Sequence, residues 1–402
     1  MISRFLPLCF VLTGLPLAAT AQDVPTPRAE PVPEADDARP PKAEPVSEPD
    51  NGEPVPKATP VDDPPAPDEP DESETHSAEL AANQPTKPQV IPEGLADKQG
   101  NYAPIPDNKT DTDTIVRIQI HLDQNNHGPG YIDGKLGEFG KKAASVYNQV
   151  RGIPVGNWYP LIKASAKTVP QPYTTYKITA GDFRFVIPVV PSKPKDQVKL
   201  KYLGYGGIGE FVAERFHTTE DYLAELNKGG KSPSRWKAGD VVKVPNVKPF
   251  ELENVKQHSS FPKDSVLSTH AVVVDIAARV AIFFDDNKKV IASFPITPGK
   301  AKFIQFGEWK LTTMITTPEF RWDKEMLENG KRSGEYFQLP IGPNSPVGIF
   351  WTGTSRTGIG LHGTSSPHTI GRSESHGCVR FANWDAIRLP TIIRPGARLV
   401  IR

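Results

Sequence analysis

Hydrophobic residues are spaced differently in three successive stretches of the chain, and each spacing predicts its own elements. In the first stretch, from Asp111 to Val155, apolar residues recur every three or four positions, as on one face of a helix. This predicts a helix ending near Asn126, a glycine-rich turn, and a second helix from about Gly140 to Arg151. A core of about forty residues is small, so we do not expect this unit to be an enzyme by itself.

The second stretch, from Tyr173 to Val247, mixes short helical and strand patterns. Apolar positions predict one helix around Phe211 and another around Tyr222, followed by a strand from Asp240 to Val244. Before these helices, FRFVIPVVPSKPKDQVKLKYLGYGG favours a β-like insertion because of its many branched and aromatic residues. We therefore expect a small α+β unit.

The third stretch, from Ser268 to Arg402, is dominated by β-type patterns. THAVVVDIAARVAIFF and KKVIASFPI contain no long amphipathic helix, which predicts a largely antiparallel sheet. A short helix is expected from Asn383 to Leu389, capped by Asn383 and stopped by Pro390. Further strands are expected at Glu308 to Thr313, Val347 to Thr352 and Ala397 to Ile401.

The first 21 residues have the pattern of a signal peptide. A basic residue, Arg4, precedes an apolar run from Phe5 to Leu17, and Ala19-Thr20-Ala21 resembles a cleavage site. We expect export to the periplasm or cell envelope, with no stable membrane insertion after cleavage. An uncleaved anchor is the weaker alternative, because the run is shorter than the roughly 20 residues that span a bilayer.

Residues 22–106 are rich in proline and acidic residues. They hold 20 of the 43 prolines, and residues 22–79 contain 17 acidic and 4 basic side chains. With so few large apolar residues, this segment is expected to be disordered and to act as a linker or, alternatively, as a solubilising tail. The remainder of the mature chain is basic, which suits an anionic polymer or substrates with carboxylates. No nucleic-acid motif, phosphate-binding loop or Rossmann fingerprint occurs.

Removal of the signal peptide leaves Cys378 as the single cysteine, within SESHGCVR. A single thiol in an exported protein favours a reactive group or an intermolecular disulfide, and a buried inert cysteine is the alternative. Among the histidines upstream, His362 is the better candidate base, because His376 lies only two residues from the thiol. Gly363 allows its carbonyl to orient the imidazole, and Gly377 allows backbone N–H groups to face a developing oxyanion.

A zinc site is a rival explanation for these side chains. His362, His368, His376 and Cys378 are possible ligand types, but their spacing matches neither a paired cysteine motif nor a helical histidine pair. We therefore predict no metal site.

The stretch GIGLHGTSSPHTIGRSESHGCVR resembles the signature of the YkuD-type L,D-transpeptidase catalytic domain, over residues 268–402. The resemblance implies Cys378 as nucleophile, His362 as general base and acid, Gly363 as orienting carbonyl, and His376 and Gly377 beside the oxyanion site. It further implies substrate-binding or shaping roles for Arg380, Ser375 and Gly371. LPIGPNSPVGIFW and FPITPGK fit the same family, whereas Thr316 to Phe337 is an insertion that forms a lid, a wall of the groove or a surface elaboration.

The two preceding units resemble domains that bind the bacterial cell wall. Residues 107–158 resemble the peptidoglycan-binding helical domain. The matching residues are Gly128, Tyr131 to Gly134, Gly137 and the closing Gly152-Ile153-Pro154. YKITAGD, Asn227, Gly239-Asp240 and Val244-Pro245 make residues 173–250 similar to a LysM domain with an insertion.

These expectations combine into a multidomain protein with a mainly β catalytic domain behind a helical domain, a LysM-like domain and a disordered linker. The resemblance implies an L,D-transpeptidase that acts on peptidoglycan stem peptides, contacts glycan strands and needs no cofactor. Two alternatives remain: an L,D-carboxypeptidase or cysteine peptidase of the envelope, and a non-catalytic wall-binding protein.

Overall fold

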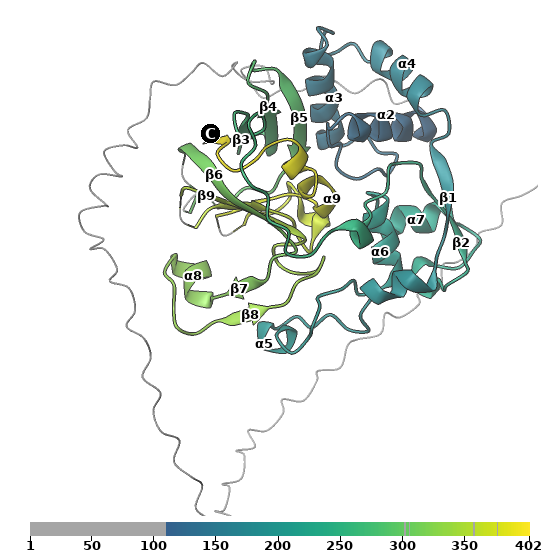
Figure 1. Cartoon of the computed structure of the whole chain (residues 1–402). Helices are drawn as coiled ribbons and strands as arrows, with labels where there is room; N and C mark the ends of the chain where they lie inside the picture. The colour runs from purple at the N-terminus through teal and green to yellow at the C-terminus, as the bar shows by residue number, and fades with distance from the viewer. Residues whose placement is uncertain (1–109, 301–302, 305, 357, 376) are drawn as a thin grey trace, which may run out of the picture. The chain divides into compact units, whose positions relative to one another are not determined.

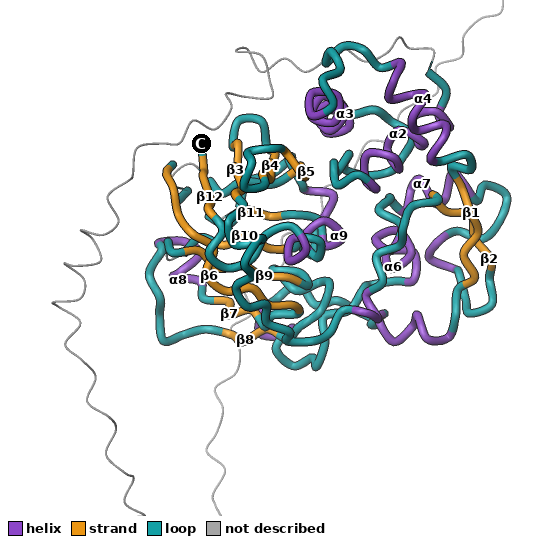
Figure 2. Tube along the Cα trace, turned by 45° about the horizontal axis from the view of Figure 1, so that its top comes forward, coloured by secondary structure: helices purple, strands orange, loops and turns teal. Residues whose placement is uncertain are grey.

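The computed structural model describes residues 110–402 except 301, 302, 305, 357 and 376 (Figures 1 and 2). The expected signal peptide and linker, residues 1–106, lie outside the described residues. All described residues belong to one compact unit, Ser73–Arg402. Among them, no helix is both long enough and apolar enough to cross a membrane.

Three helices begin the described chain: α2 (Thr112–Gln124), α3 (Glu138–Val150) and α4 (Tyr159–Thr168). The Asp111 side chain accepts a hydrogen bond from the Thr114 amide and caps α2, which explains why this helix begins there. The first two helices were predicted within about two residues of their ends. The third was not predicted, although it contributes Leu161 to the core that Ile118, Leu122 and Tyr147 form.

The next segment pairs β1 (Tyr173–Lys177) with β2 (Val241–Pro245) in an antiparallel ribbon beside α6 (Ile208–Arg215) and α7 (Glu220–Leu226) (Figure 1). The β-like insertion was predicted incorrectly. It contains a 3₁₀ helix (Ala180–Phe185) and a short helix, α5 (Pro194–Gln197), with one isolated bridge between Val186 and Tyr205. Prolines at 188, 191 and 194 remove the amide donors that a strand ladder needs.

The largest element is an eight-stranded sheet in the order β11-β10-β9-β6-β12-β3-β4-β5. Neighbouring strands are antiparallel except β10–β11 and β12–β3, so the prediction of a largely antiparallel sheet is confirmed. The strands are β3 (Ala271–Asp275), β4 (Val280–Phe284), β5 (Val290–Pro295), β6 (Gly307–Thr316), β9 (Phe350–Thr354), β10 (Gly360–His362), β11 (Val379–Arg380) and β12 (Arg398–Ile401).

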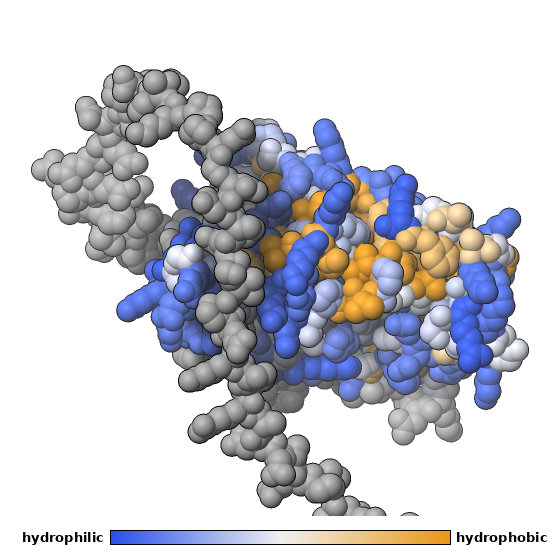
Figure 3. All heavy atoms as spheres, turned by 90° about the horizontal axis from the view of Figure 1, so that it is seen from below, coloured by the Kyte–Doolittle hydropathy of each residue, from blue (hydrophilic) through white to orange (hydrophobic). Residues whose placement is uncertain are grey.

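Both faces of strands β3, β4 and β12 are covered by apolar packing. Val272, Phe283 and Leu399 join the main core, whereas Val273 and Ile282 form a separate cluster on the opposite face. Burial on two sides explains why these strands consist of consecutive rather than alternating hydrophobic residues. Figure 3 shows the molecule from below the view of Figure 1, where hydrophobic residues form a band bordered by hydrophilic side chains.

The short helix α9 (Asn383–Ala386) begins after Ala382, so the predicted cap at Asn383 is wrong. The Asn383 side chain is buried instead, and its Oδ1 accepts hydrogen bonds from the amides of Ile349 and Thr364, each at 3.2 Å. An asparagine at a helix start is a cap only when its oxygen faces the helix. Here it joins two segments of the domain that contains the eight-stranded sheet.

The helical segment packs directly against the sheet. The Gly128 amide donates to the Ser293 carbonyl at 2.7 Å, and His127 Nδ1 lies 2.9 Å from Ser293 Oγ. Farther along, the Arg388 guanidinium donates to the buried Asp123 carboxylate at 2.8 Å. His217 Nδ1 also lies 3.1 Å from Asp123 Oδ1. The residues joined by these contacts are between 94 and 265 positions apart in the sequence.

Candidate active site

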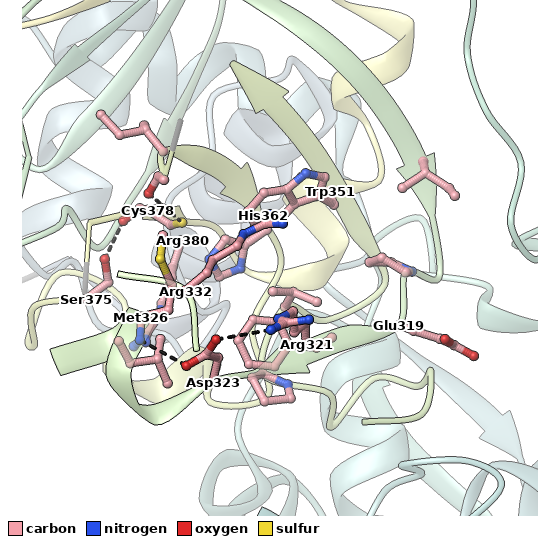
Figure 4. A pocket seen from close by; sticks show the side chains of 18 of the residues that line it. Glu319, Arg321, Asp323, Met326, Arg332, Trp351, His362, Ser375, Cys378 and Arg380 are labelled. Carbon is pink, nitrogen blue, oxygen red and sulfur yellow. Dashed lines mark hydrogen bonds and ion pairs between the residues drawn. The ribbon is translucent and has the colours of Figure 1, made fainter. Parts of the chain in front are cut away.

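Cys378 and His362 line one cavity of about 570 Å³ at the edge of the sheet. Arg380, Ser375 and Trp351 line the same cavity. Figure 4 shows Trp351 and His362 in the upper half of this site, with Asp323 and Arg321 of the insertion in the lower half. The sequence-predicted nucleophile, base and arginine are therefore brought together.

Strand register explains how these side chains come to share one cavity. β10 and β11 run parallel, and His362 pairs with Arg380. Cys378 lies immediately before β11, and its side chain lines the same cavity as those of His362 and Arg380. On the other flank of β10, His362 pairs with Trp351 of β9.

The imidazole of His362 is held from two directions. Its Nδ1 lies 2.6 Å from the Gly363 carbonyl, which can only accept, so Nδ1 carries the proton and Nε2 remains a free acceptor. Its ring stacks on the Trp351 indole, with centroids 5.4 Å apart and planes 19° apart. Burial, together with the smaller effect of the Arg380 charge, lowers the pKa of His362 to about 3.

The Cys378 thiol is partly exposed, and its Sγ lies 3.9 Å from the Gly358 carbonyl. Burial in the site raises the pKa of this thiol to about 11, although the Gly360 backbone and the Arg380 charge act in the opposite direction. Desolvation of both groups therefore favours a neutral thiol beside a neutral imidazole at pH 7. Such a thiol needs proton transfer to His362 as it attacks.

The backbone around the thiol is shaped by close contacts between glycines. Gly377 has a φ of 133°, and its amide donates to Ser375 Oγ at 3.2 Å. The Ser375 hydroxyl in turn donates to the Cys378 carbonyl. A Cβ at Gly299, in the FPITPGK segment, would overlap Gly377 Cα, so only glycine fits there. His376 lies outside the described residues.

Arg380 presents an uncompensated positive charge to the cavity. Its Nε has no hydrogen-bond partner, and no carboxylate of the described residues forms an ion pair with its guanidinium. Burial lowers the pKa of this side chain. An unpaired guanidinium two residues from a nucleophile is suited to a substrate carboxylate.

The insertion from Thr316 to Phe337 forms one wall of the cavity. It contains β7 (Phe320–Trp322) and α8 (Lys324–Asn329), and β7 pairs with β8 (Phe337–Leu339). Its cavity-lining residues are Pro318, Glu319, Phe320, Arg321, Asp323, Met326, Leu327 and Arg332. Among the three roles left open by the sequence, the wall is therefore the one that the structure contains.

Gly371 and His368 do not line this cavity. Gly371 has a φ of 69°, its amide donates to Thr297 Oγ1 at 3.0 Å, and a Cβ there would overlap the Phe139 ring of α3. The glycine thus allows close packing between the catalytic loop and a helix. His368 is exposed and lines a different cavity.

Three residues, Trp351, Gly360 and Asn383, support the site, although the sequence analysis assigned none of them this role. Trp351 stacks on the base, and Gly360 makes room for that indole, because a Cβ at Gly360 would overlap the ring. Asn383 holds the loop that carries Gly363, where a Cβ would overlap Asn383 Oδ1. The sequence offered one signal for the Trp351–His362 pair: GIFW and GIGLH are short strand-like segments close together in the chain, ending at these two residues.

A profile of the YkuD L,D-transpeptidase catalytic domain matches residues 269–401. These residues are therefore similar to the YkuD-type catalytic domain. The match includes Cys378, His362, Gly363 and Arg380, and it excludes the helical segment and the β1–β2 segment that precede it.

Curated relatives agree with this assignment. The YkuD protein of Bacillus subtilis, named as an L,D-transpeptidase, is 30% identical over 130 residues, which are 32% of this chain and 64% of that protein. A YkuD protein of Bacillus licheniformis is 24% identical over 48% of this chain and 92% of its own length. The chain thus spans less than two thirds of the first relative.

Solved structures show a weaker similarity. L,D-transpeptidase 3 from Mycobacterium tuberculosis shares 13% identity over 42% of this chain and 76% of its own, with a TM-score of 0.28. Since this score is low, the family assignment depends on the profile and the curated relatives.

Metal ligands are not gathered in the described part of the chain. No group of three histidine, cysteine, aspartate or glutamate side chains lies close enough there to hold an ion. His376, one of the four side chains considered for zinc, is outside that part.

Proposed function

We propose that this protein is a cysteine-dependent peptidoglycan L,D-transpeptidase of the cell envelope. The main support is that His362 and Arg380 are paired across β10 and β11 and line one cavity with Cys378, in a stretch that matches the YkuD catalytic domain. The acyl donor is a stem tetrapeptide, and the bond attacked joins its third residue to a terminal D-Ala.

In the first half-reaction, His362 Nε2 accepts the thiol proton as Cys378 Sγ attacks the scissile carbonyl. Gly363 stabilises the resulting imidazolium, because its carbonyl accepts a hydrogen bond from Nδ1–H. The Cys378 amide faces the oxyanion, since the Gly377 amide donates to Ser375 Oγ, and Arg380 binds the carboxylate of the leaving residue. Collapse of the intermediate releases D-Ala with the proton from His362 and leaves a thioester on Cys378.

In the second half-reaction, an amine of a neighbouring stem attacks the thioester. His362 takes a proton from this amine and returns one to the departing Cys378 sulfur. The product is an amide bond between two third residues, and Cys378 is regenerated. Water in place of the amine gives L,D-carboxypeptidase activity by the same residues.

The helical segment and the β1–β2 segment have the proposed role of holding glycan strands near the cavity. Export by the signal peptide and spacing by residues 22–106 belong to the same proposal. The proposed binding of the wall polymer is supported by the basic character of the chain after residue 79, which suits a polymer that carries carboxylates.

The decisive experiment incubates the mature chain with a defined stem tetrapeptide and follows products by mass spectrometry. We expect free D-Ala and stem dimers with the wild type and neither product with Cys378→Ala. Release of D-Ala without dimers identifies a carboxypeptidase. Absence of both products, together with no mass adduct after incubation with a carbapenem, indicates a non-catalytic wall-binding protein and rejects the proposal.

A further inference from the structure

A second cavity, which we call the acidic cavity, lies where the loop between α2 and α3, helices α6 and α7, and the loop at residues 365–372 meet. It has a volume of about 620 Å³ and shares no lining residue with the cavity around Cys378. Six carboxyl side chains line it: Asp133, Glu210, Glu214, Glu220, Asp221 and Glu225. Only two lysine or arginine side chains, Lys135 and Arg372, line it as well. Because the chain after residue 79 is basic, this cavity is a local exception to its charge.

The negative charge of the acidic cavity is not neutralised within the described part of the chain. None of the six carboxyl groups belongs to an ion pair there. Glu210 has neutral donors, since it accepts from the Gly206 amide at 2.6 Å and from Asn344 Nδ2 at 3.0 Å. The charge is therefore available to a cation from outside.

Two buried side chains that line the acidic cavity have polar atoms without a partner. Glu214 is 6% exposed and Trp384 is 3% exposed. Among the described residues, neither Glu214 Oε1 nor Trp384 Nε1 has a hydrogen-bond partner. Buried polar atoms are nearly always paired, because an unpaired one is destabilising. Two of them beside one cavity point to a ligand that supplies the missing partners.

The carboxyl groups of Glu214 and Glu210 lie near the Tyr131 hydroxyl. Burial raises the pKa of Tyr131, and the charges of the two glutamates act in the same direction, against the charge of Arg372. All four residues line the acidic cavity. Their charged groups therefore converge on one part of its wall.

Aromatic rings complete the lining of the acidic cavity. The rings of Tyr131 and Trp384 have centroids 5.7 Å apart, and Tyr222 lines the same cavity. Carboxylates beside aromatic faces suit an organic ammonium group, because both attract a cation. A metal ion fits less well, since no three histidine, cysteine, aspartate or glutamate side chains of the described residues are close enough to hold one.

We propose that the acidic cavity binds a protonated alkyl amine of a peptide and that the Glu214 carboxylate pairs with its ammonium group. The site is separate from the catalytic cavity, so the inference does not depend on the proposed function. Burial, with the Glu210 charge acting in the same direction, raises the pKa of Glu214 to about 8 despite hydrogen bonds with Tyr205 and Asn383. Glu214 is therefore mostly protonated at pH 7, and a bound ammonium favours its ionised form. Binding at pH 7 should release about one proton for each ligand bound.

The test is calorimetry on the whole chain at pH 7 with Nα-acetyl-lysine N-methylamide and with the same compound acetylated on its side-chain amine. Titrations in two buffers with different ionisation enthalpies give the number of protons released. Glu214→Gln keeps the size of the side chain and removes its charge. Glu319→Gln is the matched control, because Glu319 is a carboxylate of the catalytic cavity. Melting temperatures show whether each variant is folded.

We expect the wild type and Glu319→Gln to bind the free amine about tenfold more tightly than the acetylated compound and to release about one proton. Glu214→Gln should bind the free amine about tenfold more weakly and release no proton. Absence of binding, equal binding of both compounds, or unchanged affinity and proton release in Glu214→Gln overturns the inference. Loss of binding in Glu319→Gln also overturns it, because the amine would then occupy the catalytic cavity.

A second variant decides the matter if Glu214→Gln does not fold. Glu220 is exposed and lines the same cavity, so Glu220→Gln should leave the fold intact. Weaker binding of the free amine by this variant supports the inference, and unchanged binding overturns it.

The source of the amine is identified with a stem tetrapeptide that has a free side-chain amine. It is titrated into Cys378→Ala, with and without Glu214→Gln, so that no turnover occurs. Binding tighter than that of the lysine compound and weakened by Glu214→Gln supports the site with a stem-peptide amine as its ligand. Binding of the lysine compound alone supports it with a lysine side chain as the ligand. Because these measurements need no turnover, failure of the proposed function leaves their outcome unchanged.

Discussion

The His362 imidazole lies against the Trp351 indole, with ring centroids 5.4 Å apart. The two residues are paired across β9 and β10, so the sheet register fixes their contact. The Gly363 carbonyl fixes the ring from its other side by accepting from Nδ1. Only the orientation with Nε2 free satisfies both contacts, which prepares the imidazole to accept a proton from a thiol.

Replacing Trp351 by leucine should reduce the rate of acylation while leaving the fold in place. The leucine fills part of the space but offers no flat surface, so the imidazole samples unproductive orientations. We expect kcat for D-Ala release to fall about tenfold, which corresponds to about 1.4 kcal/mol, with little change in KM. Trp322→Leu, in the insertion and outside the cavity lining, is the matched control. A change confined to KM would contradict a role in orienting the base.

The pH dependence of alkylation tests the protonation state of the resting site. With the thiol pKa raised to about 11, the thiolate fraction of Cys378 increases with pH throughout the range from 7 to 10. The rate constant for iodoacetamide should therefore rise about tenfold per pH unit over that range, as it follows the thiolate. Cys378→Ser corrects for reaction elsewhere. A rate that is constant between pH 6 and 8 would instead reveal a thiolate–imidazolium pair.

The periodicity of the sequence predicted the elements better than it predicted their supporting contacts. Consecutive apolar residues around Val273 and Ile282 indicated strands, because both faces of the sheet exclude water. The insertion after Asp182 has many branched residues, which suggested strands. Its three prolines prevent regular strand pairing, and the composition alone did not reveal this. Composition records a preference, whereas a missing amide donor is a strict limit on pairing.

The candidate nucleophile and base were proposed from the sequence because their chemistry requires particular residue types within a short stretch. The contacts of Asn383 were not, since its partners Ile349 and Thr364 are separated from it by 34 and 19 positions. Its place at a helix start suggested a local cap, and the long-range bonds became visible only in three dimensions. The role of the insertion also required the structure, because spacing alone does not say which face a segment covers.

A buried carboxyl group predicts a further dependence on pH. Asp385 is 1% exposed and neither of its oxygens has a partner in the described residues, and burial raises its pKa to about 8 from 3.8. The stability that the protonated form contributes is complete below about pH 4 and is lost as the pH rises through 8. Asp385→Asn should therefore gain stability over the wild type between pH 5 and pH 8.

This gain is at most ~1.4 kcal/mol for each pH unit in that window. It is measured as the difference in free energy of unfolding between the two proteins in urea at each pH. Buried histidines such as His127, whose pKa burial lowers to about 3, have the opposite effect on the pH dependence of stability. Because both proteins contain these histidines, their effect cancels in the difference. A difference that is independent of pH would show that Asp385 is ionised in the folded protein.

The wall formed by the insertion depends on one carboxylate, so Asp323→Ala should loosen it without unfolding the catalytic sheet. The substitution removes the acceptor for the amides of Met326 and Ser333 and for the Arg321 guanidinium. Limited proteolysis should then cleave within residues 316–337, and KM for the donor should rise about tenfold because the wall no longer has one fixed position. Glu328→Ala is the control, since this exposed residue forms only a surface ion pair with Lys324 at 3.8 Å. Wild-type KM together with protease resistance in Asp323→Ala would show that the wall is held by its apolar contacts.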